Sequence, residues 1–221
     1  MLLLALDTST ELGSVALVAN AELRSEISAR VRSRHGETLL PLVQQALSLG
    51  GADKAELTHL AVGLGPGSFT GTRVGVATAK GLAVALDLPL IGVVSLEAIA
   101  LGAPSTRVNV VTDAHKGEVY AACYRREAGR VLEEVEPFHA APEAAHHRLP
   151  SVPSVGSGTR RYPHAFVDTL PAVFDHVRGS MVARVARSRI EAGETHDRAA
   201  LEPLYVRASD ATLPKTPLKV S

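Results

Sequence analysis

Apolar runs separated by polar turns along the first half of the chain predict alternating strands and helices. The first run, residues 2–6, is continuous and ends at Asp7, and a second run follows a polar turn at residues 14–18. The strands predicted in this half are residues 2–6, 14–18, 21–27, 59–63 and 90–93, and the helices are 38–49, 70–86 and 95–101. That order is typical of an α/β lobe built on a mixed sheet.

A second group of strands is predicted beyond a linker-like segment at residues 103–105. These strands are expected at residues 107–112, 118–125 and 130–137, and helical and loop segments follow them. The chain therefore predicts an N-terminal lobe at residues 1–102 and a C-terminal lobe with a tail at residues 103–221. The tail at residues 210–221 contains two prolines and is expected to be extended or mobile.

A glycine-rich turn directly before the second predicted helix is the most distinctive local motif. Gly65 and Gly67 allow backbone angles that other residues rarely adopt, and Ser68 or Thr70 can cap the following helix. Free N–H groups at such a helix start can cradle an anion, whereas the competing interpretation is a turn that only lets helix and strand pack closely. The motif is neither a P-loop, since no lysine follows at the required spacing, nor a dinucleotide fingerprint.

The balance of charges and the single cysteine bear on nucleic-acid binding and on the cellular compartment. The 23 basic and 23 acidic side chains cancel, so no global field attracts nucleic acid, and any tRNA contact must be local or indirect. The single cysteine, Cys123, cannot form an internal disulfide, which favours a reducing compartment. The apolar run at residues 2–6 is too short for a signal-peptide core or a membrane span, so we expect a cytoplasmic protein without membrane contact.

Motifs spread along the whole chain carry a family resemblance. They are Asp7-Thr8-Ser9-Thr10, the segment from Gly65 to Ala83, and Thr112-Asp113-Ala114-His115-Lys116-Gly117-Glu118-Val119-Tyr120. Together they resemble the TsaB (YeaZ) family. The resemblance spans nearly the whole chain, from Leu3 to the motif at residues 203–207.

This resemblance implies an actin-like ATPase (ASKHA, ribonuclease H-like) fold, in which two related lobes face a cleft and the second lobe is abbreviated. In active members of that class, carboxylate-bearing hairpins from both lobes hold phosphates and magnesium. The positions that would form an anion or nucleotide site here are Asp7, Ser9, Gly65, Gly67 and Asp113. Binding of ATP or ADP is therefore a hypothesis, and no cofactor is required.

Three details weaken the nucleotide hypothesis. Ser9 stands where active relatives commonly carry glycine, which lets the backbone approach a phosphate. The competing interpretation of Asp113 is a strand-end residue that fixes a turn before Gly117. The only candidate for an adenine-binding turn, residues 155–159, is short and generic.

Neither a metal centre nor a catalytic residue is predicted. The catalytic paralogue TsaD holds its metal with two histidines four residues apart on a helix, and the corresponding positions here are Ser95 and Ile99. The chain lacks a His-Glu-x-x-His pair, and neither Cys123 nor Ser68 has a recognisable base nearby in sequence. A glycoprotease-like hydrolase is thus the weakest alternative.

Two of the predicted helices are expected to carry a protein-binding surface. Apolar positions of residues 38–49 cover about half of the helix circumference, more than one core face requires, and small residues recur along the second helix as a ridge for close helix approach. The predicted interface residues are Leu39, Leu42, Val43, Ala46, Gly71 and Gly75. A charge at Val43 or Ala46 is expected to abolish pairing without unfolding the lobe. The competing interpretation is that both helices are simply buried within the first lobe.

By resemblance, the chain is expected to be a non-catalytic scaffold subunit in the synthesis of threonylcarbamoyladenosine in tRNA. The resemblance implies pairing with TsaD through these helices, a competing homodimer through the same surface, and the small ATPase TsaE as a third partner. Contact with tRNA would then be indirect, through the complex. One alternative is an independent small ATPase or kinase of the actin-like class that uses Asp7, Ser9 and Asp113. Another is a structural homodimer unrelated to tRNA.

Overall fold

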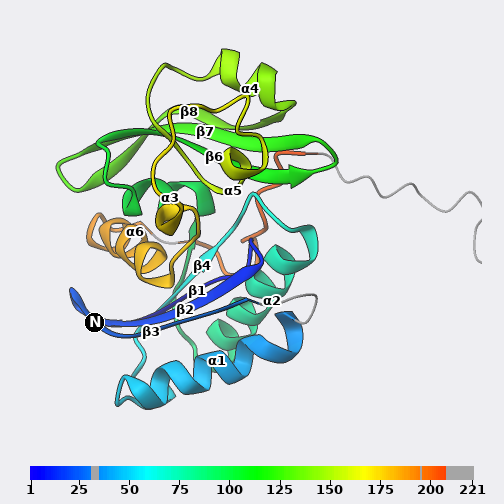
Figure 1. Cartoon of the computed structure of the whole chain (residues 1–221). Coiled ribbons are helices and arrows are strands. Elements are labelled where there is room, and N and C mark those ends of the chain that lie inside the picture. The colour runs from blue at the N-terminus through cyan, green and yellow to red at the C-terminus, as the bar shows by residue number, and fades with distance from the viewer. Residues whose placement is uncertain (31–34, 195, 208–221) are drawn as a thin grey trace, which may run out of the picture.

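The computed structural model describes residues 1–30, 35–194 and 196–207, so the predicted tail at residues 210–221 lies outside the described part of the chain. The described residues form two β-sheets with helices between and outside them (Figure 1). From bottom to top, Figure 1 shows a pair of helices, the first sheet, a second pair of helices, the second sheet and a short outer helix.

The first sheet contains the five strands predicted for the N-terminal lobe. They are β1 (Leu2–Asp7), β2 (Leu12–Ala19), β3 (Glu22–Arg30), β4 (His59–Gly63) and β5 (Leu90–Val93), in the spatial order β3-β2-β1-β4-β5. The hairpin strands β1, β2 and β3 are antiparallel, whereas β4 and β5 lie parallel to β1. The predicted mixed sheet is confirmed.

Helices cover both faces of this sheet. On the outer face lie α1 (His35–Leu49) and α2 (Phe69–Ala85), which contact each other, and on the inner face lies α3 (Ser95–Gly102), which faces the second sheet. α1 begins at His35 and not at residue 38 as predicted, so Pro41 lies inside the helix. Pro41 is exposed, where water can replace the lost backbone hydrogen bond.

Among the described residues, no helix combines the length and apolarity needed to span a bilayer.

The second sheet repeats the first in shorter form. Its strands are β6 (Arg107–His115), β7 (Glu118–Glu127), β8 (Arg130–Ala140) and β9 (Ser154–Val155), in the order β8-β7-β6-β9. This order and its strand directions match β3-β2-β1-β4, and α5 (Ser157–Arg161) follows β9 as α2 follows β4. No described strand corresponds to β5 in this sheet. The expected fold, actin-like with an abbreviated second lobe, is therefore confirmed.

The predicted boundary between lobes at residues 102 and 103 needs a correction. Helix α6 (Gly179–Glu191), from the second half of the sequence, packs across the strands of the first sheet and against α3. Gly179 is a glycine because a Cβ there would lie 2.8 Å from Ala16 N on β2. The first lobe is thus completed by residues from the C-terminal half, since its inner face needs a second helix to exclude water.

Three apolar clusters hold these layers together. One lies between α1, α2 and the first sheet, and a second, containing Ala5, Ile99, Tyr124 and Val182, joins both sheets through α3 and α6. The third lies between the second sheet and the short outer helix α4 (Pro142–Arg148). Short 3₁₀ turns at Lys54–Glu56 and Ala172–Phe174 complete the connections. The two lobes are consequently fused along the α3–α6 side by a continuous core.

Candidate functional site

The glycine turn between β4 and α2 is packed against the end of β1. Ser68 is the N-cap of α2, and its Oγ accepts a hydrogen bond from Gly71 N at 3.2 Å. Ser68 N donates to Ser9 O at 2.7 Å. A Cβ atom on Gly67 would lie 2.1 Å from that carbonyl oxygen. Gly67 therefore permits close backbone packing, in agreement with the competing interpretation of the motif.

Asp7, the last residue of β1, is fully buried beneath this turn. Its Oδ1 accepts hydrogen bonds from Ser9 N at 2.8 Å and from Ser9 Oγ at 2.7 Å, and its Oδ2 accepts one from Ser95 Oγ at 2.6 Å. A side chain at Gly63 would collide with it, because a Cβ there would lie 1.7 Å from Asp7 Oδ2. The carboxylate thus joins β1 to the start of α3.

Gly65 belongs to the same buried junction. Gly65 N donates to Ser95 Oγ at 3.0 Å, and Ser95 N donates to Gly65 O at 2.8 Å. Its φ of +84° favours glycine. The prediction that Asp7 and Gly65 contact an anion or nucleotide is wrong for this structure, because both residues are buried and neither lines the cleft between the lobes.

The other three predicted site residues do come together. Ser9, Gly67 and Asp113 line one cleft of about 950 Å³ between the two lobes. Asp113 Oδ2 lies 3.5 Å from Arg161 Nε and 3.5 Å from His115 Nδ1. The cleft therefore contains a carboxylate and cationic or titratable side chains from the second lobe. Opposite them, the first lobe presents hydroxyl and backbone groups together with the paired side chains of Glu11 and Arg30.

The turn at residues 155–159 supports the second lobe from inside. Gly156 has a φ of +115°, and a Cβ there would lie 2.3 Å from Val111 O. Gly156 N donates to Asp175 Oδ1 at 2.9 Å, and Arg160 Nε donates to Asp175 Oδ2 at 2.8 Å. Ser157 from this turn reaches the cleft wall. Contact of this turn with an adenine stays a prediction.

The positions that correspond to metal ligands in TsaD are used for packing here. Ser95 joins Asp7 to Gly65 as described above, and Ile99 is buried in the core between the two sheets. Within the described ranges, no group of three or more His, Cys, Asp or Glu side chains could hold a metal ion.

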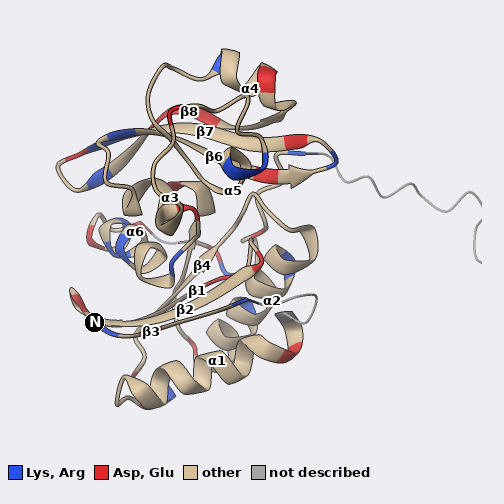
Figure 2. Cartoon of the chain, in the orientation of Figure 1, with Lys and Arg blue, Asp and Glu red and all other residues tan. Residues whose placement is uncertain are grey.

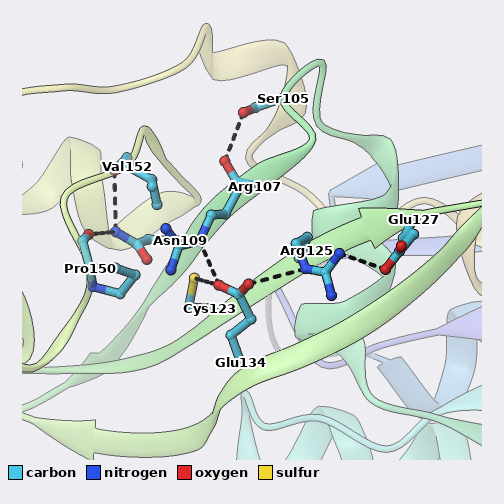
Figure 3. Close-up of polar contacts among 9 residues, drawn as sticks. All are labelled: Ser105, Arg107, Asn109, Cys123, Arg125, Glu127, Glu134, Pro150 and Val152. Atoms are coloured by element: carbon cyan, nitrogen blue, oxygen red, sulfur yellow. Dashed lines mark hydrogen bonds and ion pairs between the residues drawn. The ribbon is translucent and has the colours of Figure 1, made fainter.

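Cys123, the only cysteine of the chain, lies on β7 and is fully buried. Its Sγ donates to Glu134 Oε2 at 3.7 Å, and Arg107 Nε donates to the same oxygen at 2.6 Å (Figure 3). Burial and the neighbouring Glu134 carboxylate raise the pKa of the thiol to about 11. The thiol is therefore protonated at neutral pH, which opposes a role as a nucleophile.

The predicted interface residues on α1 are buried in the chain itself. Leu39, Leu42, Val43 and Ala46 are at most 8% exposed and belong to the cluster that packs α1 and α2 on the first sheet. The prediction that these four side chains form a partner surface is wrong, because they face β2, β3 and α2. A charge at Val43 or Ala46 should destabilise the lobe rather than block pairing selectively.

The glycine ridge on α2 also faces inward. A Cβ on Gly71 would lie 2.2 Å from Thr8 O, and one on Gly75 would lie 2.3 Å from Thr8 Oγ1. Thr8 Oγ1 donates to Gly71 O at 2.7 Å. The ridge therefore lets α2 approach the end of β1, and the prediction that Gly71 and Gly75 contact a partner is wrong as well.

The exposed side of the same two helices carries apolar residues that the sequence interpretation did not select. Leu40 and Leu49 of α1 are 49% and 66% exposed, and Val84 of α2 is 69% exposed. Gly81 lies on the exposed side, and a Cβ there would meet no atom within 4 Å. Among Asp, Glu, Lys and Arg residues, α1 contains only Glu37 and α2 only Arg73 and Lys80, so both helices are mostly tan in Figure 2.

Two charged residues of α2 are engaged with the C-terminal segment rather than with this face. Arg73 Nε donates to Tyr205 Oη at 2.8 Å, and Lys80 Nζ donates to Ala199 O at 2.8 Å. The sequence does contain a signal for the exposed apolar side of α1, because residues 38–49 contain no charged side chain. Such a helix is unusual when one side faces water.

Comparison with known proteins places the chain among tRNA-modification proteins. A family model described as "TsaD: tRNA N6-adenosine threonylcarbamoyltransferase" matches residues 22–156. The tRNA threonylcarbamoyladenosine biosynthesis protein TsaB of Escherichia coli is 39% identical over 74% of each chain. The protein of the same name from Haemophilus influenzae is 33% identical over 97% of each chain.

Solved structures show the same similarity. YeaZ from Pseudomonas aeruginosa superimposes with a TM-score of 0.83 at 27% identity, covering 92% of this chain and 99% of that one. A second structure from Pseudomonas aeruginosa, described as an uncharacterized protein similar to peptidase YeaZ, gives a TM-score of 0.84 at 28% identity and covers 93% and 99% of the two chains.

Proposed function

Because this chain belongs to the TsaB (YeaZ) family of tRNA threonylcarbamoyladenosine biosynthesis proteins, we propose that it is a non-catalytic scaffold subunit that binds and activates TsaD. The contact surface is the exposed side of α1 and α2, which we call the α1–α2 outer face: Leu40, Gln44, Ser48, Leu49, Ala77, Gly81 and Val84. This assignment replaces the buried residues chosen from the sequence.

The composition of the α1–α2 outer face is the observation that supports the proposal most directly. Exposed leucine and valine side chains stand there among uncharged polar residues, and charged residues are depleted in the core of protein–protein interfaces. Gly81 adds a second argument. A glycine in the middle of a helix costs about 1 kcal/mol relative to alanine, and no contact within the described part of the chain requires one at position 81. Close approach of a partner helix would require it.

The placement of two chemically reactive side chains supports an accessory role rather than catalysis. Asp7 is buried and accepts hydrogen bonds from Ser9 and Ser95, and the Cys123 thiol is buried with a raised pKa. A second copy of this chain would use the same outer face as TsaD, so homodimer and heterodimer would compete. TsaE would join the assembled complex, and tRNA would be bound through that complex.

Light scattering on size-exclusion peaks tests the proposal. The chain is run alone and mixed with TsaD from the same organism, as wild type and as Leu40→Glu and Gly81→Leu. We expect a self-dimer that gives way to a mixed complex, and the loss of both in the two variants. The matched control is Leu132→Glu, because Leu132 is also an exposed leucine but lies on β8 of the second sheet.

Two outcomes would overturn parts of this assignment. A mixed complex that survives in both variants would contradict the α1–α2 outer face as the contact surface. Failure of wild type to form any complex with TsaD, at several salt concentrations, would contradict the scaffold role itself. An independent ATPase would then be the next hypothesis, and turnover of ATP by the purified chain would support it.

We also propose that the inter-lobe cleft binds an anion or nucleotide, now without Asp7 and Gly65. The supporting observation is that Ser9, Gly67 and Asp113 line the same cleft with the exposed guanidinium of Arg161. Calorimetry with millimolar ATP and magnesium tests this, with Arg161→Ala as the variant that should lose the heat of binding. An absence of heat from the wild-type protein would reject the site.

A further inference from the structure

The C-terminal segment, residues 196–207, runs along the flank of α2 in the opposite direction to the helix. We call it the C-terminal strap. Near the end of α2, Arg198 Nη1 donates to Ala83 O at 3.0 Å and to Asp87 Oδ1 at 3.1 Å. In the middle of the helix, Lys80 Nζ donates to Leu201 O at 3.1 Å. The strap in Figure 1 is the orange-red segment that passes α2 and reaches the second sheet.

The strap is fixed to the first lobe by a buried side chain and a backbone hydrogen bond. Leu201 is 8% exposed and belongs to the apolar cluster beneath α1 and α2. Leu204 N donates to Leu64 O, directly after β4, at 2.8 Å. These contacts join residues far apart in sequence, so they form only when the lobe is complete.

Tyr205 closes a stack at the first turns of α2. The Arg73 guanidinium carbon lies 3.5 Å from the centre of the Phe69 ring and 5.5 Å from the centre of the Tyr205 ring. Arg73 Nε also donates to Tyr205 Oη at 2.8 Å. Both rings are nearly half exposed, so the stack stands at the surface beside the glycine turn.

The next two residues cross to the second sheet. Val206 O lies 3.1 Å from His139 Nδ1 on β8, and Arg207 Nη1 lies 3.2 Å from Glu118 Oε2 at the start of β7. The strap, the start of α2 and the β6–β7 turn together surround a crevice of about 460 Å³. The strap therefore bridges the two lobes on the side opposite the fused α3–α6 core.

We propose that the C-terminal strap is a tie that holds the β6–β7 end of the second sheet against the start of α2 and so sets the shape of the inter-lobe cleft. The continuous core fixes the two lobes to each other on the α3–α6 side. Movement of one lobe relative to the other is therefore concentrated at the opposite edge, where the C-terminal strap lies. The β6–β7 turn bears His115, which lines both the crevice and the cleft. This inference concerns the isolated chain and does not rest on the proposed function.

The test compares variants of the full-length chain that remove the contacts of the C-terminal strap to one lobe or to the other. His139→Ala with Arg207→Ala removes the contacts to the second sheet, and Tyr205→Ala removes the contact to Arg73 at the start of α2. The matched control is Arg125→Ala, which removes the ion pairs to Glu127 and Glu134 on the second sheet, neither of which involves the strap. Spin labels on Gln45→Cys and Glu136→Cys report the separation of the lobes, since Cys123 is buried and stays unlabelled.

We expect one narrow distance distribution for wild type and control, and a broader one for both strap variants. Amide exchange of residues 113–119 should accelerate at least about tenfold in the strap variants. Unchanged distances and unchanged exchange in both strap variants would overturn the proposal. If the double variant lacks a cooperative thermal transition, the milder Arg207→Gln decides by the same two measurements, because it keeps a polar side chain at the same position.

Discussion

At the scale of single residues, Asp7 illustrates how a motif residue can be structural. Its carboxylate is fully buried and accepts hydrogen bonds from Ser9 and Ser95, which belong to different elements. A buried carboxylate must be compensated by such donors or it would take up a proton. The side chain therefore joins a strand, a turn and a helix start, which explains its presence without a ligand.

Replacing Asp7 by asparagine should destabilise the fold by about 2–3 kcal/mol, because the new amide group brings a buried donor to a place where Ser9 and Ser95 already donate. Urea denaturation measures this change. Asp113→Asn is the comparison, with an expected loss below about 1 kcal/mol, since the ion pairs of Asp113 are longer and partly exposed. Equal losses in the two variants would contradict a structural role specific to Asp7.

Cys123 gives a second prediction at this scale. With a pKa of about 11, about one thiol in a thousand is ionised at pH 8, and access is blocked by burial. Reaction of the native protein with a thiol reagent at pH 8 should therefore be at least about a hundredfold slower than reaction of the protein unfolded in guanidinium. Rapid labelling of the native protein would show that the thiol is accessible and would reopen a nucleophilic role.

At the scale of elements, the strands and helices of the first lobe and three strands of the second were predictable, but the outward sides of α1 and α2 were not. The wide apolar surface of residues 38–49 predicts more than one contact side for this helix. Periodicity cannot say which part of such a surface faces the sheet, because that depends on how the helix is rotated. Leu39 and Val43 proved to face the core, whereas Leu40 and Leu49 face outward.

Two glycines of α2 should respond in opposite ways to alanine. At Gly81 a Cβ meets no atom, so Gly81→Ala should stabilise the isolated chain by about 1 kcal/mol through helix propensity. At Gly71 a Cβ would lie 2.2 Å from a backbone oxygen, so Gly71→Ala should destabilise it by at least about 2 kcal/mol. Thermal unfolding measures both changes.

Substitutions of Gly81 also test whether the α1–α2 outer face is a contact surface. Gly81→Ala should weaken association with a partner while it stabilises the monomer, and Gly81→Leu should weaken it by about tenfold or more. A gain in stability without any loss of affinity would mean that Gly81 lies outside the contact surface.

At the scale of the whole molecule, the family resemblance implied two related lobes, whereas the exchange of segments between the lobes was not predicted. The pattern of apolar and polar residues by itself predicted only two α/β halves. The packing of α6 on the first sheet and the path of the C-terminal strap depend on contacts such as Arg73 to Tyr205, 132 positions apart. The local pattern of apolar and polar residues does not indicate contacts between residues so far apart in sequence. The predicted boundary at residue 102 therefore divided elements that pack together.

The junction between the lobes contains a buried ion pair with a measurable dependence on pH. Glu97 on α3 accepts a hydrogen bond from Arg189 Nη2 on α6 at 2.5 Å. Burial raises the pKa of Glu97 above its usual 4.5, and Arg189 opposes that rise only in part. Between pH 4.5 and the raised pKa, the folded chain thus binds more protons at Glu97 than the unfolded chain does.

The free energy of unfolding should therefore contain a component that is fully present below about pH 4.5 and is lost as pH rises through the folded pKa of Glu97, with a slope of at most ~1.4 kcal/mol per pH unit. Glu97→Gln lacks this component, whereas Glu134 and Glu143, whose lowered pKa values give the opposite slope, contribute equally to both proteins. The difference between wild type and variant, measured by urea denaturation from pH 4 to 8, isolates Glu97. Parallel profiles of unfolding free energy against pH for wild type and variant would show that burial between the lobes does not raise the pKa of Glu97. The α3–α6 junction would then have to admit water.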